Sequence, residues 1–366
     1  MLRGMLRTMR YARGWAAGAD VVVEETEIVR DGVSVPSTLV LPARRPRPLP
    51  GWIVLGGMSR SGRFHPQLVR FGNALAASGA AVLVPGIPEW RRLEMAPGVT
   101  APTIQGSVAA LRKRKEVGPG KLGLVGFSFG APQAAIAAAR EETVEQIGGV
   151  VLFGGYCSLE RTLTCQMTGQ HEWQGAEYSL DPDPYGRWVV AKNHLTDVEG
   201  LEDAGDVAVA LAHLAEAASG QRISAWEPYH DEMIRELRLT MPARWQALFD
   251  LFATPTNGTS AEREECREMA VRLSGACRRV EPLLDPEPDL IRVRLPTQLI
   301  HGRGDRLIPY TEGLRMRDGL PAEARAGLTV TELFSHSAGR VAGSWFDRAR
   351  EGVTFFEALR RVINAV

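Results

Sequence analysis

One pentapeptide of the sequence has the residue types and spacing of a serine nucleophile. Gly126-Phe127-Ser128-Phe129-Gly130 fits the pattern G-x-S-x-G, which is short enough to occur by chance. However, the apolar run Leu122 to Val125 precedes it and the alanine-rich stretch Ala131 to Ala139 follows it. A strand that turns sharply into a helix exposes a serine hydroxyl beside the positive end of the helix dipole. The context therefore predicts Ser128 as a nucleophile.

A serine hydroxyl is a weak nucleophile without a general base, and His336 is the best placed of the seven histidines. It follows the last predicted strand, in a loop of small residues from which it can reach the carboxyl edge of a sheet. The four histidines from His171 to His230 lie in a region of predicted helices. His301 ends a predicted strand, and we expect it to fix a turn.

Asp305 is the candidate for the carboxylate that orients this base. It lies in the glycine-rich turn His301 to Pro309, directly after a predicted strand. An aspartate in a surface turn is the alternative interpretation, because Asp is a common turn former. The chain order Ser128, Asp305, His336, with each residue at a strand end, favours a catalytic triad.

The elements that must position these residues alternate along the chain. Apolar residues make up 45% of the 366 residues and charged residues 23%, so a full hydrophobic core is expected. A hairpin with a turn at Asp31-Gly32 is followed by buried strands that alternate with helices, which predicts a doubly wound, mostly parallel α/β sheet. The strands are predicted at Val21 to Val29, Val33 to Leu41, Trp52 to Leu55, Ala81 to Val84, Leu122 to Val125, Val150 to Phe153, Leu295 to His301 and Leu328 to Leu333.

The alternation breaks over residues 156–289, which read as mainly helical. This stretch is too long for a loop, and we expect it to be an inserted helical cap or lid. The sequence thus predicts an N-terminal extension at residues 1–20, an α/β core at 21–155 and 290–366, and the insertion between the two core segments. The extension carries arginines at helical spacing and is expected to form a surface helix.

The motifs resemble those of the α/β-hydrolase superfamily. Gly126 to Gly130, Gly302 to Pro309 and His336 look like its nucleophile elbow, acid turn and histidine loop. The resemblance covers the two core segments and places the insertion between the sixth and seventh strands, where capped members carry their lids. It implies acyl transfer through an acyl-enzyme, with water usually the final acceptor.

The resemblance also implies an oxyanion hole made of two backbone N–H groups. One belongs to Phe129, directly after the nucleophile. The other belongs to the loop after the third strand, where Met58 is the first choice and Gly57 the second. Many members of the superfamily have His-Gly here, whereas this chain has Gly56-Gly57, so the identity of the second donor stays open.

Four further residues are candidates for substrate binding. Arg60 and His65 could bind an anionic part of the substrate, although solvated loop charges are the alternative. Tyr185 and Trp188 could line an apolar acyl pocket, although aromatic residues at helical spacing more often pack a core.

Several classes of partner are not expected. Lys+Arg and Asp+Glu are both 43, which argues against a nucleic-acid partner. There is no H-E-x-x-H motif and no clustering of histidines, so we expect no metal and no cofactor. No run is long and apolar enough to span a membrane. The four cysteines are expected to be reduced, mostly buried thiols, as in a cytoplasmic protein; whether the chain forms a homo-oligomer stays open.

The sequence therefore predicts a serine hydrolase that cleaves a carboxylic ester of a small molecule. A peptidase, an amidase or a thioesterase could use the same triad, because the fold does not choose among them. A relative that binds a small ligand without catalysis is the alternative from another class.

Overall fold

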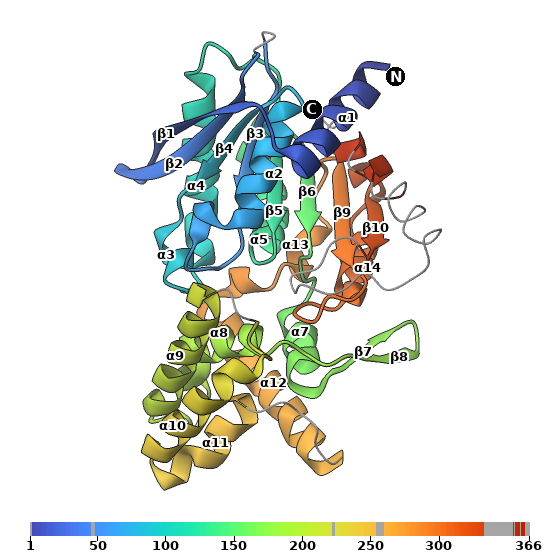
Figure 1. The fold of residues 1–366 in the computed structure, drawn as a ribbon. Coiled ribbons are helices and arrows are strands. Elements are labelled where there is room, and N and C mark those ends of the chain that lie inside the picture. The colour runs from blue at the N-terminus through green and yellow to red at the C-terminus, as the bar shows by residue number, and fades with distance from the viewer. Residues whose placement is uncertain are drawn as a thin grey trace.

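In the computed structural model, the described residues are 2–44, 48–221, 224–253, 260–332, 354, 356–358 and 360–362. Within these ranges eight strands form one sheet in the order β1-β2-β4-β3-β5-β6-β9-β10 (Figure 1). Neighbouring strands from β4 to β10 are parallel, and β2 pairs antiparallel with both β1 and β4. The bounds are β1 Val21–Arg30, β2 Val33–Pro42, β3 Gly51–Leu55, β4 Ala81–Pro85, β5 Leu122–Phe127, β6 Ile147–Phe153, β9 Thr297–Gly302 and β10 Gly327–Thr331. The predicted doubly wound, mostly parallel sheet is confirmed.

Helices cover both faces of the sheet, which explains why the central strands are continuous apolar runs. Alternate residues of β3 point to opposite faces: Trp52 belongs to the same core cluster as Phe71 of α2, whereas Ile53 belongs to the cluster that contains Ile104 of α4. The elements beside the sheet are α1 Leu2–Ala17, α2 Pro66–Ala77, α3 Pro88–Arg91, α4 Thr100–Arg112, α5 Gly130–Ala138, α6 Glu141–Gln146, α13 Glu287–Leu290 and α14 Tyr310–Gly319.

The hairpin at the start of the sheet is also confirmed. Asp31 and Gly32 have φ values of 49° and 80°, the left-handed pair that a two-residue turn needs to match the strand twist. The predicted helix in the N-terminal extension is present as α1, which packs on α2 through an edge-to-face contact of Tyr11 with Phe71.

Between β6 and β9, the described part of residues 159–280 forms six α-helices and a small hairpin, and we call residues 159–280 the helical insertion. It lies beyond the carboxyl ends of the parallel strands (Figure 1). The hairpin was not predicted, because its strands are short, mostly polar and half to fully exposed. The bounds are α7 Leu159–Thr168, β7 Gln170–Trp173, β8 Ala176–Ser179, α8 Tyr185–His194, α9 Gly205–Gln221, α10 Asp231–Thr240, α11 Ala243–Ala253 and α12 Ser260–Val280.

A buried carboxylate joins the helical insertion to the sheet. Oε2 of Glu312, on α14, accepts hydrogen bonds from the N–H groups of Cys157 (2.9 Å) and Ser158 (2.7 Å) at the start of α7. Nε of Arg161 donates to Oε1 of Glu312 at 3.1 Å, and the same guanidinium contacts Glu287 at 3.1 Å. Because Glu287 lies just beyond α12, Arg161 connects both ends of the insertion.

Glu312 should make stability depend on pH. Burial raises the pKa of its carboxyl above the ordinary value of 4.5, although Arg161 and the two N–H groups oppose the shift. When the pKa of a group is higher in the folded than in the unfolded protein, the group stabilises the fold fully below its unfolded-state pKa. This stabilisation is lost as the pH rises through the folded-state pKa. We therefore expect the difference in unfolding free energy, wild type minus Glu312→Gln, to decrease as the pH rises above 4.5. Parallel stability curves in denaturant titrations would contradict this.

The cysteines are not arranged as nucleophiles. Cys157, Cys165, Cys266 and Cys277 are all buried free thiols, as expected from the sequence. Burial raises the pKa of each thiol, which disfavours the reactive thiolate.

Among the described helices, none combines the length and the apolar character needed to cross a membrane.

Candidate active site

Ser128 lies in a sharp turn between β5 and α5. Its φ is 52°, a left-handed conformation that is rare for residues other than glycine. The Ser128 N–H donates to the carbonyl of Phe153 at 2.9 Å, which ties the turn to the neighbouring strand. A Cβ atom on Gly126 would lie only 2.2 Å from the Gly130 carbonyl oxygen. A Cβ atom on Gly130 would likewise lie 2.5 Å from the Gly56 carbonyl oxygen. Close packing therefore explains both flanking glycines, and the predicted arrangement of strand, turn and helix is present.

The strain at Ser128 gives a prediction for stability. A left-handed residue with a Cβ is disfavoured, whereas glycine adopts this conformation readily. We expect Ser128→Gly to be about 1 kcal/mol more stable than Ser128→Ala, although glycine also makes the unfolded chain more flexible. Denaturant unfolding of the two variants compares them directly. An equal or lower stability of the glycine variant would show that the turn is not strained.

The loop after β3, residues 56–60, lies against this turn. A Cβ atom on Gly57 would be 2.9 Å from Cβ and 3.4 Å from Oγ of Ser128, so no other side chain fits there without displacing the serine. In the part of the chain that the structure describes, no backbone hydrogen bond has the N–H of Met58 or of Phe129 as its donor. Both donors suggested for the oxyanion hole thus belong to segments next to Ser128.

Asp305 lies in the turn after β9, with 1% of its surface exposed. Its Oδ1 accepts hydrogen bonds from the N–H groups of Leu307 at 2.9 Å and Ile308 at 3.1 Å. Nε2 of His301 lies 3.9 Å from Oδ2 of Asp305 and is 2.9 Å from the Ile308 carbonyl oxygen. His301 therefore fixes this turn, as predicted. Asp305 is not an exposed turn residue.

Strand register places Ser128 and Asp305 at one edge of the sheet. Phe127 of β5 pairs with Phe153 of β6, which pairs with Ile300 of β9. Ser128 directly follows Phe127, the last residue of β5, and Asp305 lies in the turn that follows β9. Because the carboxyl ends of parallel strands meet at the same edge, both side chains lie where open α/β sheets bind ligands.

The predicted base, His336, lies outside the described residues. The strand that leads towards it, β10, pairs with β9 as far as Thr331 opposite Gly302. The N–H of Arg303 donates to the Thr331 carbonyl at 3.0 Å. The end of β10 is thus fixed beside the turn that holds Asp305.

The two residues predicted to bind an anionic group have different positions. Arg60, at the end of the loop after β3, is exposed, and its Nη1 lies 3.0 Å from a carboxylate oxygen of Glu216 on α9. His65 precedes α2 as its N-cap residue and is half-buried. The guanidinium of Arg60 therefore already contacts a carboxylate of the helical insertion.

The two predicted aromatic residues, on consecutive turns of α8, also differ. The Tyr185 hydroxyl donates to the Met58 carbonyl at 3.1 Å, which brings this side chain to the loop beside Ser128. Trp188 is fully buried, and its Nε1 donates to the Phe252 carbonyl at 2.9 Å within the insertion. The contacts of Trp188 are those of a core residue, the alternative interpretation of its spacing.

Sequence reasoning missed one residue at this loop. The Ser219 Oγ on α9 accepts a hydrogen bond from the Arg60 N–H at 2.9 Å. A single serine near the end of a helix carries no motif, so nothing in the sequence could have identified it.

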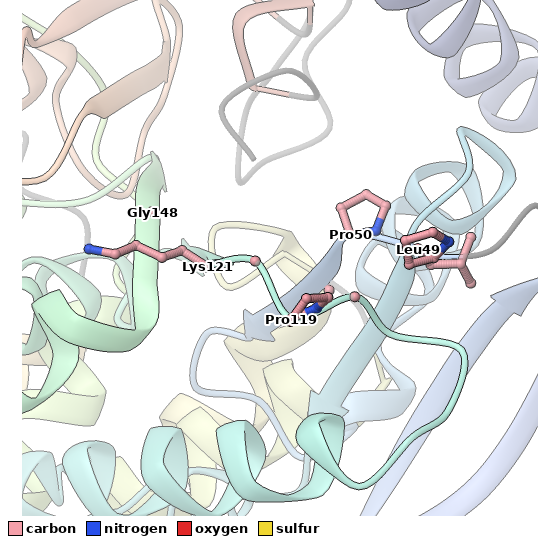
Figure 2. Close-up of a pocket in the computed structure, with 9 residues that line it drawn as sticks. Leu49, Pro50, Pro119, Lys121 and Gly148 are labelled. Atoms are coloured by element: carbon pink, nitrogen blue, oxygen red, sulfur yellow. The ribbon is translucent and has the colours of Figure 1, made fainter.

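A hollow of about 330 Å³ elsewhere in the molecule is not part of this site (Figure 2). It is lined by Leu49, Pro50 and Gly51 at the start of β3, by Lys121 before β5 and by Gly148 near the start of β6. These residues lie at the amino ends of the strands, the edge opposite Ser128.

In the described ranges, no three His, Cys, Asp or Glu side chains are grouped so that they could hold a metal ion.

Comparisons with known proteins add evidence on the fold. No family model matches the sequence, and curated proteins give no match to it. The chain is similar to the structure of a 2,6-dihydroxy-pseudo-oxynicotine hydrolase, with 17% identity over 97% of this chain and 72% of that one and a TM-score of 0.50. It is also similar to an acylaminoacyl peptidase from Pyrococcus horikoshii, with 11% identity over 94% of this chain and 42% of that one and a TM-score of 0.49. A third similarity is to a 2-hydroxy-6-oxo-6-phenylhexa-2,4-dienoate hydrolase from Rhodococcus, with 16% identity over 93% and 99% of the two chains and a TM-score of 0.46.

Proposed function

Because this chain has the α/β-hydrolase fold, we propose that it is a serine hydrolase which cleaves a carboxylic ester of a small molecule through an acyl-enzyme intermediate. One observation carries the proposal. Ser128 has a left-handed backbone conformation at the carboxyl edge of the sheet, and the backbone of Gly57 lies against its side chain. Strained residues of this kind cluster at functional sites.

Each residue of the proposed triad has a distinct role. Ser128 Oγ attacks the acyl carbon while His336 takes its proton, and His336 then gives the proton to the departing alcohol. In the second half of the reaction His336 takes a proton from water, which attacks the acyl-enzyme. The carboxylic acid is released and the proton returns to Ser128. Asp305 orients the histidine and stabilises its charged form. The assignment of His336 rests on its place in the sequence after β10, and that of Asp305 on its burial at the same edge as Ser128.

The proposed oxyanion hole uses the N–H groups of Phe129 and Met58, with Gly57 as the alternative to Met58. Phe129 precedes α5 directly, so the positive end of the helix dipole adds to the stabilisation of a negative oxygen. Donors fixed before the reaction stabilise the transition state without reorganising, and the loss of one costs about 2.7–4 kcal/mol.

The helical insertion is proposed to act as a cap that covers the substrate. Its position beyond the strand ends supports this, as does the contact of Tyr185 with the loop beside Ser128. Of the residues suggested for substrate binding, Tyr185 and His65 remain candidates. Arg60 would have to exchange its contact with Glu216 for a substrate anion, and Trp188 would act only by shaping the cap.

The class of bond that is cleaved can be tested with matched substrates. Steady-state rates on the p-nitrophenyl ester, the thioester and the p-nitroanilide of one acyl group compare the three leaving groups directly. We expect the largest kcat/KM for the ester. An equal or larger value for the anilide or thioester would instead favour an amidase, peptidase or thioesterase. No turnover of any acyl chain from acetyl to octanoyl would favour a ligand-binding relative without catalysis.

A further inference from the structure

The loop after β3 is bound at two points by hydroxyl groups of the helical insertion. At one point Tyr185 Oη, on α8, donates to the Met58 carbonyl at 3.1 Å. At the other, Ser219 Oγ, on α9, accepts from the Arg60 N–H at 2.9 Å. Residues 58 to 60 of the loop are therefore bridged by two side chains from distant parts of the chain.

The two hydroxyls bind the loop with opposite polarity. Tyr185 donates its proton to the Met58 carbonyl, whereas the Ser219 oxygen accepts the Arg60 N–H. One hydroxyl therefore holds a carbonyl group of the loop and the other holds an N–H group. The ion pair of Arg60 with Glu216 adds a contact to α9, but both side chains are nearly half exposed, so its contribution is small.

We propose that Tyr185 and Ser219 are positioning residues that hold the oxyanion loop, residues 56–60, with the Met58 N–H directed at the reacting carbonyl. This inference rests on the proposed function. Gly57, on one side of Met58, lies against Ser128, and the two hydroxyls bind the loop on the other side. The donor is thus confined between the nucleophile and the helical insertion.

The arrangement has a consequence for catalysis. Two consecutive glycines, Gly56 and Gly57, begin the loop, and glycine restrains the backbone less than any other residue. Oxyanion donors act well only when they are fixed before the reaction. The insertion therefore completes the oxyanion hole instead of only covering the substrate, and losing its contacts should lower kcat more than it raises KM.

The first test measures the loop itself and does not depend on hydrolysis. Hydrogen exchange followed by mass spectrometry reports on peptides that span residues 56–61 in wild type, Tyr185→Phe and Ser219→Ala. We expect exchange in this loop to be about tenfold faster in both variants. Tyr229→Phe is the matched control, because Tyr229 belongs to the same insertion and is 57% exposed. Unchanged loop exchange in Tyr185→Phe and Ser219→Ala would overturn the proposal.

The second test separates positioning from substrate contact. In Tyr185→Phe, kcat for the best ester should fall about tenfold with KM nearly unchanged, because a misplaced donor weakens the transition state only. Ser219→Thr retains a hydroxyl and should retain wild-type kcat. A rise in KM with unchanged kcat would overturn the proposal in favour of direct substrate binding. If wild type hydrolyses nothing, the proposed function fails, and loop exchange still decides whether the two hydroxyls fix the loop.

Discussion

Replacing Ser128 with Ala is expected to lower kcat by about six orders of magnitude, because removal of a triad nucleophile leaves only binding and oxyanion stabilisation. The variant keeps the Cβ atom and the left-handed backbone conformation of the elbow. Its fold and its unfolding midpoint should therefore match those of wild type. Rates on the best ester, with circular dichroism of both proteins, provide the measurement.

A matched control is Ser34→Ala, since Ser34 lies on the exposed β1–β2 hairpin far along the chain from the elbow. This variant should retain wild-type kcat. If Ser128→Ala kept more than about one hundredth of the activity, a group other than the Ser128 hydroxyl would be the nucleophile and the proposed mechanism would be wrong.

The second large effect is expected for Asp305→Asn. The asparagine can keep the side-chain oxygen that accepts the N–H groups of Leu307 and Ile308, so the turn should persist. It cannot stabilise a protonated histidine or hold the correct tautomer, and kcat should fall by about 10⁴. Asp305→Ala should show the same loss of activity and a further loss of stability of about 1–3 kcal/mol, because one partly buried and one buried N–H group lose their acceptor.

The two substitutions at Asp305 separate a catalytic from a structural role. If Asp305→Asn kept kcat within about tenfold of wild type, the carboxylate would only fix the turn, and the acid of the triad would lie elsewhere. Steady-state kinetics and denaturant unfolding of both variants distinguish these outcomes.

The strands of the sheet could be predicted because they are buried on both faces. Ile53 and Val54, for example, point to opposite faces of β3 and are both fully buried, so the strand appears as an uninterrupted apolar run. The hairpin of β7 and β8 could not be predicted in this way, since its residues are mostly polar and half to fully exposed. Only the turn at Gln174-Gly175, with φ values of 51° and 79°, carries a hairpin signal.

The candidate site shows the same division. Ser128 and Asp305 could be proposed as site residues because each occupies a recognisable local pattern at a strand end. Ser219 could not, because its role depends on α9 packing beside a loop that lies 159 residues earlier in the sequence. Trp188 shows why the alternative of core packing had to stay open, because an aromatic residue in a predicted cap does not reveal whether it faces the substrate or the core.

The most direct test of the proposed mechanism is labelling of the purified protein with a fluorophosphonate probe, which reacts with activated serines, followed by peptide mass mapping. We predict a single modified residue, Ser128, and no labelling of Ser128→Ala. Modification at another serine, or no modification of folded wild-type protein, would contradict the assignment of Ser128 as the nucleophile.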